Sequence, residues 1–176
     1  FRDHPIDALQ YGTTEGYGPL RDCLKAYMKR KHGIGRSFDD LLITSGAQQA
    51  IELVAKVLCN PGDVVLCESP SFVGALNSIK SLGARLVGVP LQEDGVDIAA
   101  LEETLKTEKN VKFLYLIPNF QNPSGITTSL EKRRKIPAKR PETPARSKKT
   151  KKEHLFANVT DFRQIYEVKS IQTEGN

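Results

Sequence analysis

Short apolar runs separated by helical segments constrain the fold of this chain more than any other feature of its sequence. Three runs are typical of buried strands: VVLC at 64–67, ARLVGV at 84–89 and VKFLYLI at 111–117. They are nearly continuous in apolar residues, which indicates strands that are covered on both faces. Helical segments lie between them, so right-handed crossovers and a mostly parallel sheet are expected. The predicted fold class is therefore α/β, a three-layer arrangement with helices on both faces of the sheet.

The helical segments are identified by their apolar periodicity and by the residues at their ends. Four helices are expected, at 20–32, 45–58, 71–83 and 98–106. Pro19 and Gly33 suit the two ends of the first helix, and Asp97 can cap the last one. EKRRKI at 131–136 can open a further helix. The β-branched run LLIT at 41–44 is expected to be a short strand that leads into the second helix.

Charge and composition change sharply after residue 130. Residues 131–152 carry 11 basic and 2 acidic side chains, a charge of +9, within a chain of net charge +5. From residue 137 the sequence is rich in proline and charge, and it cannot bury enough apolar surface to offset its chain entropy. Residues 137–176 are therefore predicted to be a mostly disordered tail with one short helix at about 155–168. Because the basic block has no aromatic residues for base stacking, a solvated tail is favoured over nucleic-acid binding.

Cysteine usage and hydropathy place the chain in a broad class. The three cysteines, Cys23, Cys59 and Cys67, are an odd number without CxxC spacing, which indicates reduced thiols in a cytoplasmic protein. No segment reaches the ~18 consecutive apolar residues of a membrane span, so no membrane association is expected. The histidines show no metal-ligand spacing, and no metal site is predicted.

Two segments at predicted strand ends can bind an anion or a planar ligand. Gly46, Ala47 and Gln48 lie where a strand meets a helix N-terminus, and their N–H groups and the helix dipole favour a phosphate. The loop PNFQNPSG at 118–125 follows a predicted parallel strand, the place where open α/β sheets bind ligands. Its Asn122 offers an amide, and its X-Pro bonds can be cis. A capped helix without a ligand and an ordinary turn are the alternatives.

Two aromatic residues are further candidates. Phe72, in ESPSF after the strand at 64–67, can belong to the core or offer a flat face to a planar ring. Tyr11, in the glycine-rich segment YGTTEGYGPLR, can donate a phenolic hydrogen bond to an anion or can simply pack within its loop.

Five motifs in one order and spacing resemble those of the fold-type I pyridoxal-phosphate aminotransferases of class I/II. They are YGTTEGYGPLR, ITSGAQQAI, NPGDVVLCESPSF, GARLVGVPLQEDGVD and PNFQNPSG, and together they cover about residues 9–136. The resemblance is strongest to the 2-aminoadipate and aromatic aminotransferase subgroup. It implies a partial large domain over residues 1–136, amino-group transfer from an amino acid to a 2-oxo acid, and a homodimer.

The resemblance also implies roles for individual residues. The backbone amides of Gly46, Ala47 and Gln48 match the turn that holds the phosphate of pyridoxal 5'-phosphate. Phe72 matches the aromatic residue that stacks on the pyridine ring, and Asn122 matches the asparagine that binds the phenolic oxygen of the ring. Tyr11 matches the tyrosine that reaches the phosphate in the neighbouring subunit.

The family motifs are truncated at both ends of this chain. No residue matches the lysine that holds the cofactor as a Schiff base, so no catalytic residue is assigned and the chain is expected to be inactive by itself. The family also pairs the strand that matches LLIT with a later strand that has no counterpart here. A non-catalytic pseudo-enzyme, a dimer-capping module and part of a GntR-type aminotransferase-like regulator are the alternative functions.

Overall fold

A computed structural model describes residues 9–35 and 37–136 of the chain. The predictions of a disordered tail at 137–176 and of a helix at about 155–168 lie outside the described residues. The chain divides into two compact units, Phe1–Gly46 and Ala47–Asn176.

The first unit is built around helix α2 (Gly18–His32). Its ends agree with the sequence prediction, because a proline occupies the first turn and Gly33 caps the C-terminus with a φ of 67°. None of the residues of α2 is buried. Asp40 in the following segment lies 2.7 Å from Arg21 and 2.5 Å from Lys25 of the helix, so ion pairs connect the two segments.

The prediction of a strand at LLIT is wrong. Residues 41–44 belong to no strand, although the N–H group of Ile43 donates to the Glu15 carbonyl at 2.9 Å. A strand requires a neighbour that pairs with its row of N–H and C=O groups. The described part of the first unit contains no strand that could supply these hydrogen-bond partners.

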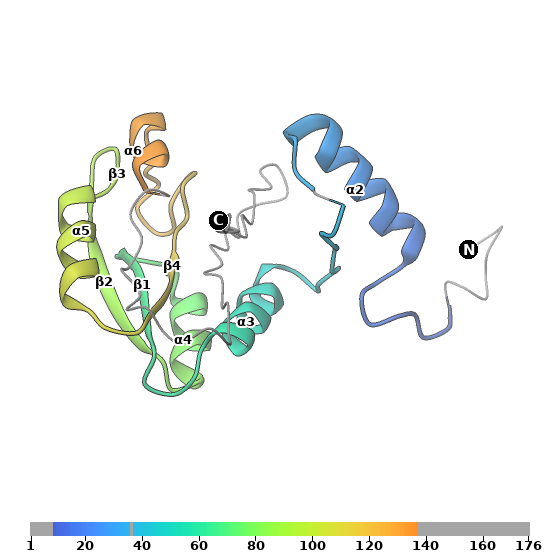
Figure 1. Ribbon diagram of the computed structural model, residues 1–176, viewed down its shortest axis with the longest axis horizontal. Coiled ribbons are helices and arrows are strands. Elements are labelled where there is room, and N and C mark those ends of the chain that lie inside the picture. The colour runs from blue at the N-terminus through green and yellow to red at the C-terminus, as the bar shows by residue number, and fades with distance from the viewer. Residues whose placement is uncertain (1–8, 36, 137–176) are drawn as a thin grey trace, which may run out of the picture. The chain divides into compact units, whose positions relative to one another are not determined.

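The second unit contains a four-stranded sheet whose strand order is β3-β2-β1-β4 (Figure 1). The strands are β1 (Val64–Ser69), β2 (Arg85–Gln92), β3 (Gly95–Val96) and β4 (Val111–Tyr115). β1 pairs in parallel with both β2 and β4, which confirms the parallel arrangement that the sequence predicts. The short β3 was not predicted, and it pairs antiparallel with β2 through a tight hairpin.

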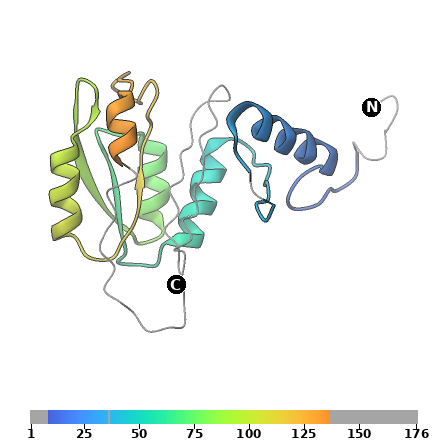
Figure 2. The ribbon, with the colours of Figure 1, turned by 45° about the horizontal axis from the view of Figure 1, so that its top comes forward.

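Helices cover both faces of this sheet, as Figure 2 shows. They are α3 (Ala47–Leu58), α4 (Val73–Ser81), α5 (Ile98–Thr107) and α6 (Leu130–Lys135). Val65 and Cys67 of β1 belong to the core cluster that includes residues of α3 and α4. Val64 and Leu66, which point the opposite way, belong to the cluster that includes Leu101 of α5. The alternation along one strand therefore supplies two separate cores.

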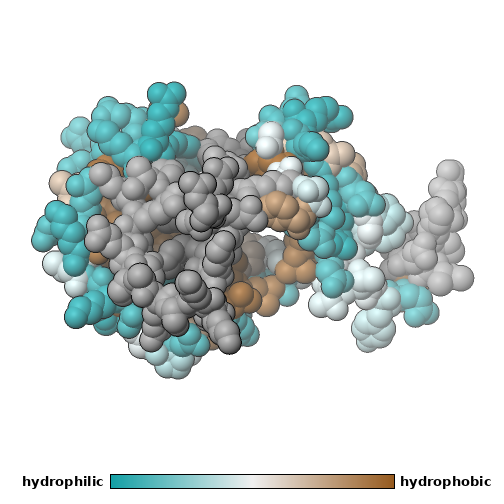
Figure 3. Space-filling view, viewed as in Figure 1, coloured by the Kyte–Doolittle hydropathy of each residue, from teal (hydrophilic) through white to brown (hydrophobic). Residues whose placement is uncertain are grey.

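The outward side of α5 is charged. Glu103 and Lys106 are both exposed and lie 3.5 Å apart, and Figure 3 shows hydrophilic surface over this helix at the left of the view. Among residues 9–35 and 37–136, none of the helices combines the length and the hydropathy of a membrane span.

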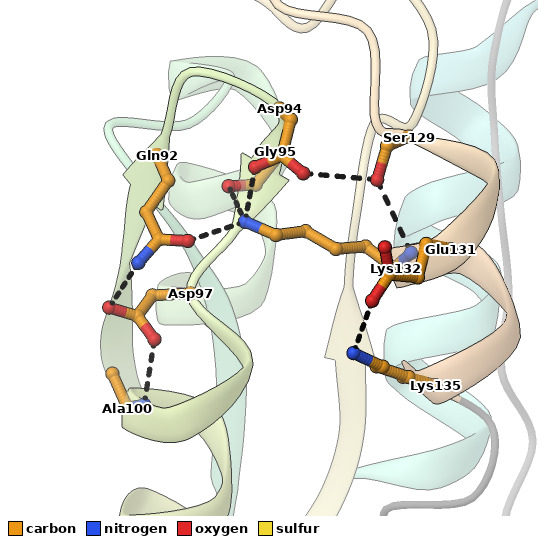
Figure 4. Close-up of polar contacts among 9 residues, drawn as sticks. All are labelled: Gln92, Asp94, Gly95, Asp97, Ala100, Ser129, Glu131, Lys132 and Lys135. Atoms are coloured by element: carbon orange, nitrogen blue, oxygen red, sulfur yellow. Dashed lines mark hydrogen bonds and ion pairs between the residues drawn. The ribbon is translucent and has the colours of Figure 1, made fainter.

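A buried lysine joins α6 to the β2–β3 hairpin (Figure 4). The Lys132 ammonium lies 2.6 Å from the Gln92 side-chain oxygen, 3.3 Å from the Gly95 carbonyl and 2.6 Å from an Asp94 carboxylate oxygen. Ser129 also binds Asp94, since its hydroxyl donates at 3.1 Å. The helix that follows the 118–128 segment is therefore fixed to the hairpin at the end of β2.

We expect Lys132→Met to lower the free energy of unfolding by about 1–3 kcal/mol, because the buried Gly95 carbonyl and the Gln92 side-chain oxygen lose their donor. The matched control is Lys135→Met, which removes an exposed i,i+4 partner of Glu131 and should change stability little. Urea unfolding of both variants measures the difference. Equal effects of the two substitutions would contradict the assignment of Lys132 as the connection to the hairpin.

Candidate functional site

The carboxyl ends of β1 and β4 are adjacent in the second unit. The two strands are parallel neighbours, and Cys67 is paired with Tyr115 near their ends. The segments that follow them, which contain Phe72 and Asn122, therefore begin at the same edge of the sheet. This edge is where open parallel sheets bind ligands.

Phe72 and Gln48 lie close together at this edge. Phe72 is the N-cap residue of α4 and is partly buried against the core cluster of α3 and α4. Gln48 in the first turn of α3 donates to the Gly74 carbonyl at 3.0 Å and to the Ser78 hydroxyl at 2.6 Å. A side chain at Gly74 would meet both the Phe72 ring and the Gln48 amide, at 2.6 and 2.7 Å. The glycine thus allows the N-termini of α3 and α4 to approach each other.

A buried carboxyl group connects β1 to the segment after β4. Glu68 is 1% exposed, and its Oε2 atom accepts from the N–H group of Ile117 at 3.0 Å and from the Gln121 amide at 3.3 Å. Burial raises the pKa of the Glu68 carboxyl to about 7, although both of these hydrogen bonds favour the charged form. Sequence analysis missed this residue, and the available signal was a charged side chain directly after an apolar strand.

The charge of Glu68 also affects its neighbours. Burial is the main cause that raises the pKa of the Cys67 thiol to about 11, and the Glu68 carboxylate adds to it. The same two causes raise the pKa of the Tyr115 phenol. Both groups are therefore neutral near pH 7, and neither supplies a positive charge to Glu68.

Gln121 organises the loop that carries Asn122. It is 2% exposed, and its amide N–H group also donates to the Pro70 carbonyl at 2.8 Å. Its amide oxygen accepts from the N–H group and the hydroxyl of Ser124, at 2.9 and 2.6 Å. The Asn122–Pro123 bond in this loop is cis, which the sequence analysis allowed, and Ser69–Pro70 is cis as well.

Arg133 of α6 holds the same loop from its other end. Its guanidinium donates to the carbonyls of Thr128 and Pro118, both at 2.7 Å, and to the Asn119 side chain at 2.5 Å. The loop is thus held on one side by β1 and on the other by α6.

The structure places the other predicted site residues as follows. Gly46 has a φ of 88°, in the left-handed region that favours glycine, and a side chain there would meet no atom within 4 Å. Ala47 opens α3, and both Ala47 and Gln48 are exposed. Asn122 is exposed in its loop. Tyr11 is fully exposed and, like Gly46, belongs to the first unit.

We expect the stability of Glu68→Gln relative to the unsubstituted chain to depend on pH. The pKa of the Glu68 carboxyl rises from 4.5 to about 7 on folding, so between these values the folded state binds more protons than the unfolded state. The free energy of unfolding of the unsubstituted chain therefore falls as the pH rises through this window. Glutamine does not titrate, so the variant gains stability relative to the unsubstituted chain between about pH 5 and pH 7.

Urea unfolding across this range measures the trend. The control is Glu108→Gln, which removes a partly exposed carboxylate whose pKa is lowered mainly by its hydrogen bond with Arg85. Its effect should be constant above about pH 5, where that group is charged in both states. A constant effect of Glu68→Gln over the same range would show that Glu68 does not titrate there.

Comparison with known proteins identifies relatives of this chain. The model of the family "Aminotransferase class I and II" matches residues 6–142. Aromatic-amino-acid aminotransferase 1 of Thermococcus litoralis is 44% identical over 136 residues, which are 75% of this chain and 32% of that protein. The 2-aminoadipate transaminase of Thermus thermophilus is 46% identical over 129 residues, which are 73% of this chain and 31% of that protein.

A solved structure and a regulator are similar as well. The crystal structure of Pyrococcus horikoshii kynurenine aminotransferase has a TM-score of 0.72 and 38% identity, and the match covers 77% of this chain and 34% of that one. An uncharacterized HTH-type transcriptional regulator of Bacillus subtilis is 35% identical over 131 residues, which are 74% of this chain and 27% of that protein.

The chain thus spans about a third of the length of the aminotransferases that it matches. The family match includes all six residues that the motifs single out, from Tyr11 to Asn122, together with the Glu68–Gln121 connection. With both the sequence and the fold in agreement, the chain belongs to the class I and II aminotransferases.

Proposed function

We propose that this chain contributes the phosphate-binding and ring-binding part of a pyridoxal 5'-phosphate site. The whole protein would transfer an amino group from an amino acid to a 2-oxo acid. The observation that carries the proposal is the arrangement of Gln48, Phe72 and Asn122. They lie on three different segments of the second unit, and hydrogen bonds to the Gly74 and Pro70 carbonyls connect those segments.

The residues present suit such a ligand. The exposed start of α3 offers backbone N–H groups at a helix N-terminus, which favours a phosphate. Phe72 offers an aromatic face, and the buried Ser71 hydroxyl beside it has no hydrogen-bond partner within the described residues. Asn122 is exposed and can donate to an oxygen of the ring. When bound, pyridoxal phosphate supplies the electron sink for chemistry on the amino group.

Each residue has a specific task in this proposal. The amides of Gly46, Ala47 and Gln48 bind the phosphate, Phe72 orients the ring, and Asn122 holds a ring oxygen. Tyr11 contacts the phosphate in a second copy of the chain, so the working form is a homodimer with shared sites.

We further propose that the 176 residues do not catalyse transamination by themselves. None of their lysines stands in a motif that matches the Schiff-base lysine of the family. The proposed division is a partial large domain at 1–136 and a separate tail at 137–176. The location is cytoplasmic, a proposal that the free thiols of Cys23, Cys59 and Cys67 support.

Reduction with borohydride tests whether the chain anchors the cofactor. The purified chain is mixed with pyridoxal phosphate, reduced, and digested for mass spectrometry of modified lysines. We expect no single preferred lysine, and scattered labels in the basic segment at 131–152. One strongly labelled lysine with a protein-bound absorption band would contradict the proposal of an inactive chain.

Pyridoxine 5'-phosphate tests the non-covalent contacts separately, because it lacks the aldehyde that reacts with lysines. We expect Phe72→Ala to weaken its binding by about tenfold, roughly 1.4 kcal/mol, through loss of the stacking face. The matched control is Phe38→Ala, which removes an exposed phenyl group of the first unit and should leave the dissociation constant unchanged. Equal losses in both variants, measured by equilibrium dialysis, would count against the assignment of Phe72.

The second candidate function is a non-catalytic, dimer-capping or regulatory module of a GntR-type regulator. The similarity to the HTH-type regulator of Bacillus subtilis favours it. The coding DNA upstream of Phe1 distinguishes the two functions. An in-frame winged-helix segment supports the regulator, and its absence from the complete reading frame supports the enzyme.

A further inference from the structure

We propose that the buried Glu68–Gln121 pair is a positioning device that fixes Phe72 relative to Asn122. This inference rests on the proposed function for the identity of the ligand, but the positioning itself can be measured without any ligand. Neither residue would touch the cofactor, so both are positioning residues.

The pair lies between the two segments that it would align. Glu68 closes the buried part of β1 four residues before Phe72, and Gln121 directly precedes Asn122. The Gln121 amide donates both to Glu68, at 3.3 Å, and to the Pro70 carbonyl, at 2.8 Å. The Gln121 amide, which belongs to the loop after β4, thus binds both the end of β1 and the turn that follows β1.

The orientation of this amide is fixed by its hydrogen bonds. Its nitrogen donates to two acceptors, Glu68 and Pro70, and its oxygen accepts from the N–H group and the hydroxyl of Ser124. Rotating the amide by half a turn would bring N–H groups against the Ser124 N–H group and an oxygen against a carboxylate. Since the side chain is 2% exposed, water cannot replace these bonds. The position of the Asn122 backbone therefore follows from that of β1.

A polar pair of this kind is a poor source of stability alone. A buried carboxyl group that lacks a cation is expensive in free energy compared with an apolar side chain of the same volume. Within the described residues, the titratable groups that interact with the Glu68 charge are Cys67 of β1 and Tyr115 of β4, and neither is a cation. The pair instead fixes the arrangement of the segments after β1 and β4. It supplies hydrogen-bond partners to backbone groups of both segments.

Hydrogen exchange of the full chain measures the positioning directly. We expect Gln121→Ala to speed amide exchange by about tenfold in both 69–73 and 119–126, because each segment loses a bond to the amide. Ser124→Ala removes the hydroxyl that donates to the Gln121 amide oxygen and accepts from the Ile126 N–H group, and it serves as a milder variant that is expected to fold. It should affect both segments in the same direction, to a smaller extent.

The control for general destabilisation is Val64→Ala. Val64 is 2% exposed at the amino end of β1, four residues before Glu68, and belongs to the core cluster with Leu101. The variants are compared at equal free energy of unfolding, which is adjusted with urea. Under these conditions Val64→Ala should not speed amide exchange in both 69–73 and 119–126. Faster exchange in 119–126 alone in the Gln121 and Ser124 variants would overturn the proposal.

Affinity for pyridoxine 5'-phosphate separates this inference from the proposed function. If the unsubstituted chain binds, Ser124→Ala should weaken binding by several-fold, whereas the control Glu108→Gln should leave the dissociation constant unchanged. If it does not bind, the proposed function fails for this chain, while the exchange data still decide the positioning. Binding that is unaffected by Ser124→Ala and Gln121→Ala would overturn the positioning role.

Discussion

The parallel pairing of β1 with strands on both of its sides is the constraint on which the rest of the second unit depends. Val65 and Leu66 of this strand are completely buried, and they face opposite layers of helices. A shift of the register by one residue would exchange the two faces, so the pairing is strongly specified. Once β1 and β4 are aligned, the segments that follow them must emerge together at one edge.

That edge is stabilised by polar rather than apolar contacts. Loops have backbone groups that need partners when they are buried, and an apolar side chain cannot satisfy them. Glu68 supplies partners from β1, Gln121 supplies them from the loop after β4, and Arg133 supplies them from α6. The exposed Asn122 is thus presented by a loop whose two sides are both held.

The parallel sheet and the helices on its two faces could be predicted from the sequence. The spacing of apolar residues and the residue types at helix ends depend only on nearby positions in the chain. Pro19, Gly33 and Asp97 mark helix ends through their own backbone preferences or side-chain bonds, and they do so in the structure as well. LLIT was predicted wrongly because strand formation depends on a neighbour and not on β-branched composition alone. The β2–β3 hairpin was missed because a strand of two residues is too short to show an alternation of apolar and polar side chains.

The candidate site was predictable residue by residue only through the resemblance to a family. Local reasoning identified Phe72 and Asn122 as separate possibilities at two strand ends. It could not identify Glu68 and Gln121 as partners, because 53 positions separate them and only the pairing of β1 with β4 brings them together. Long-range polar contacts of this kind follow from topology, which periodicity does not specify.

We propose that the carboxyl edge of β1 and β4 binds a phosphorylated pyridine. Amide resonances of the 15N-labelled chain, titrated with pyridoxine 5'-phosphate, test it most directly. We expect saturable shifts at Gln48, Phe72 and Asn122, with small shifts elsewhere in the second unit. Shifts confined to the basic segment at 131–152, without saturation at the strand ends, would contradict the claim.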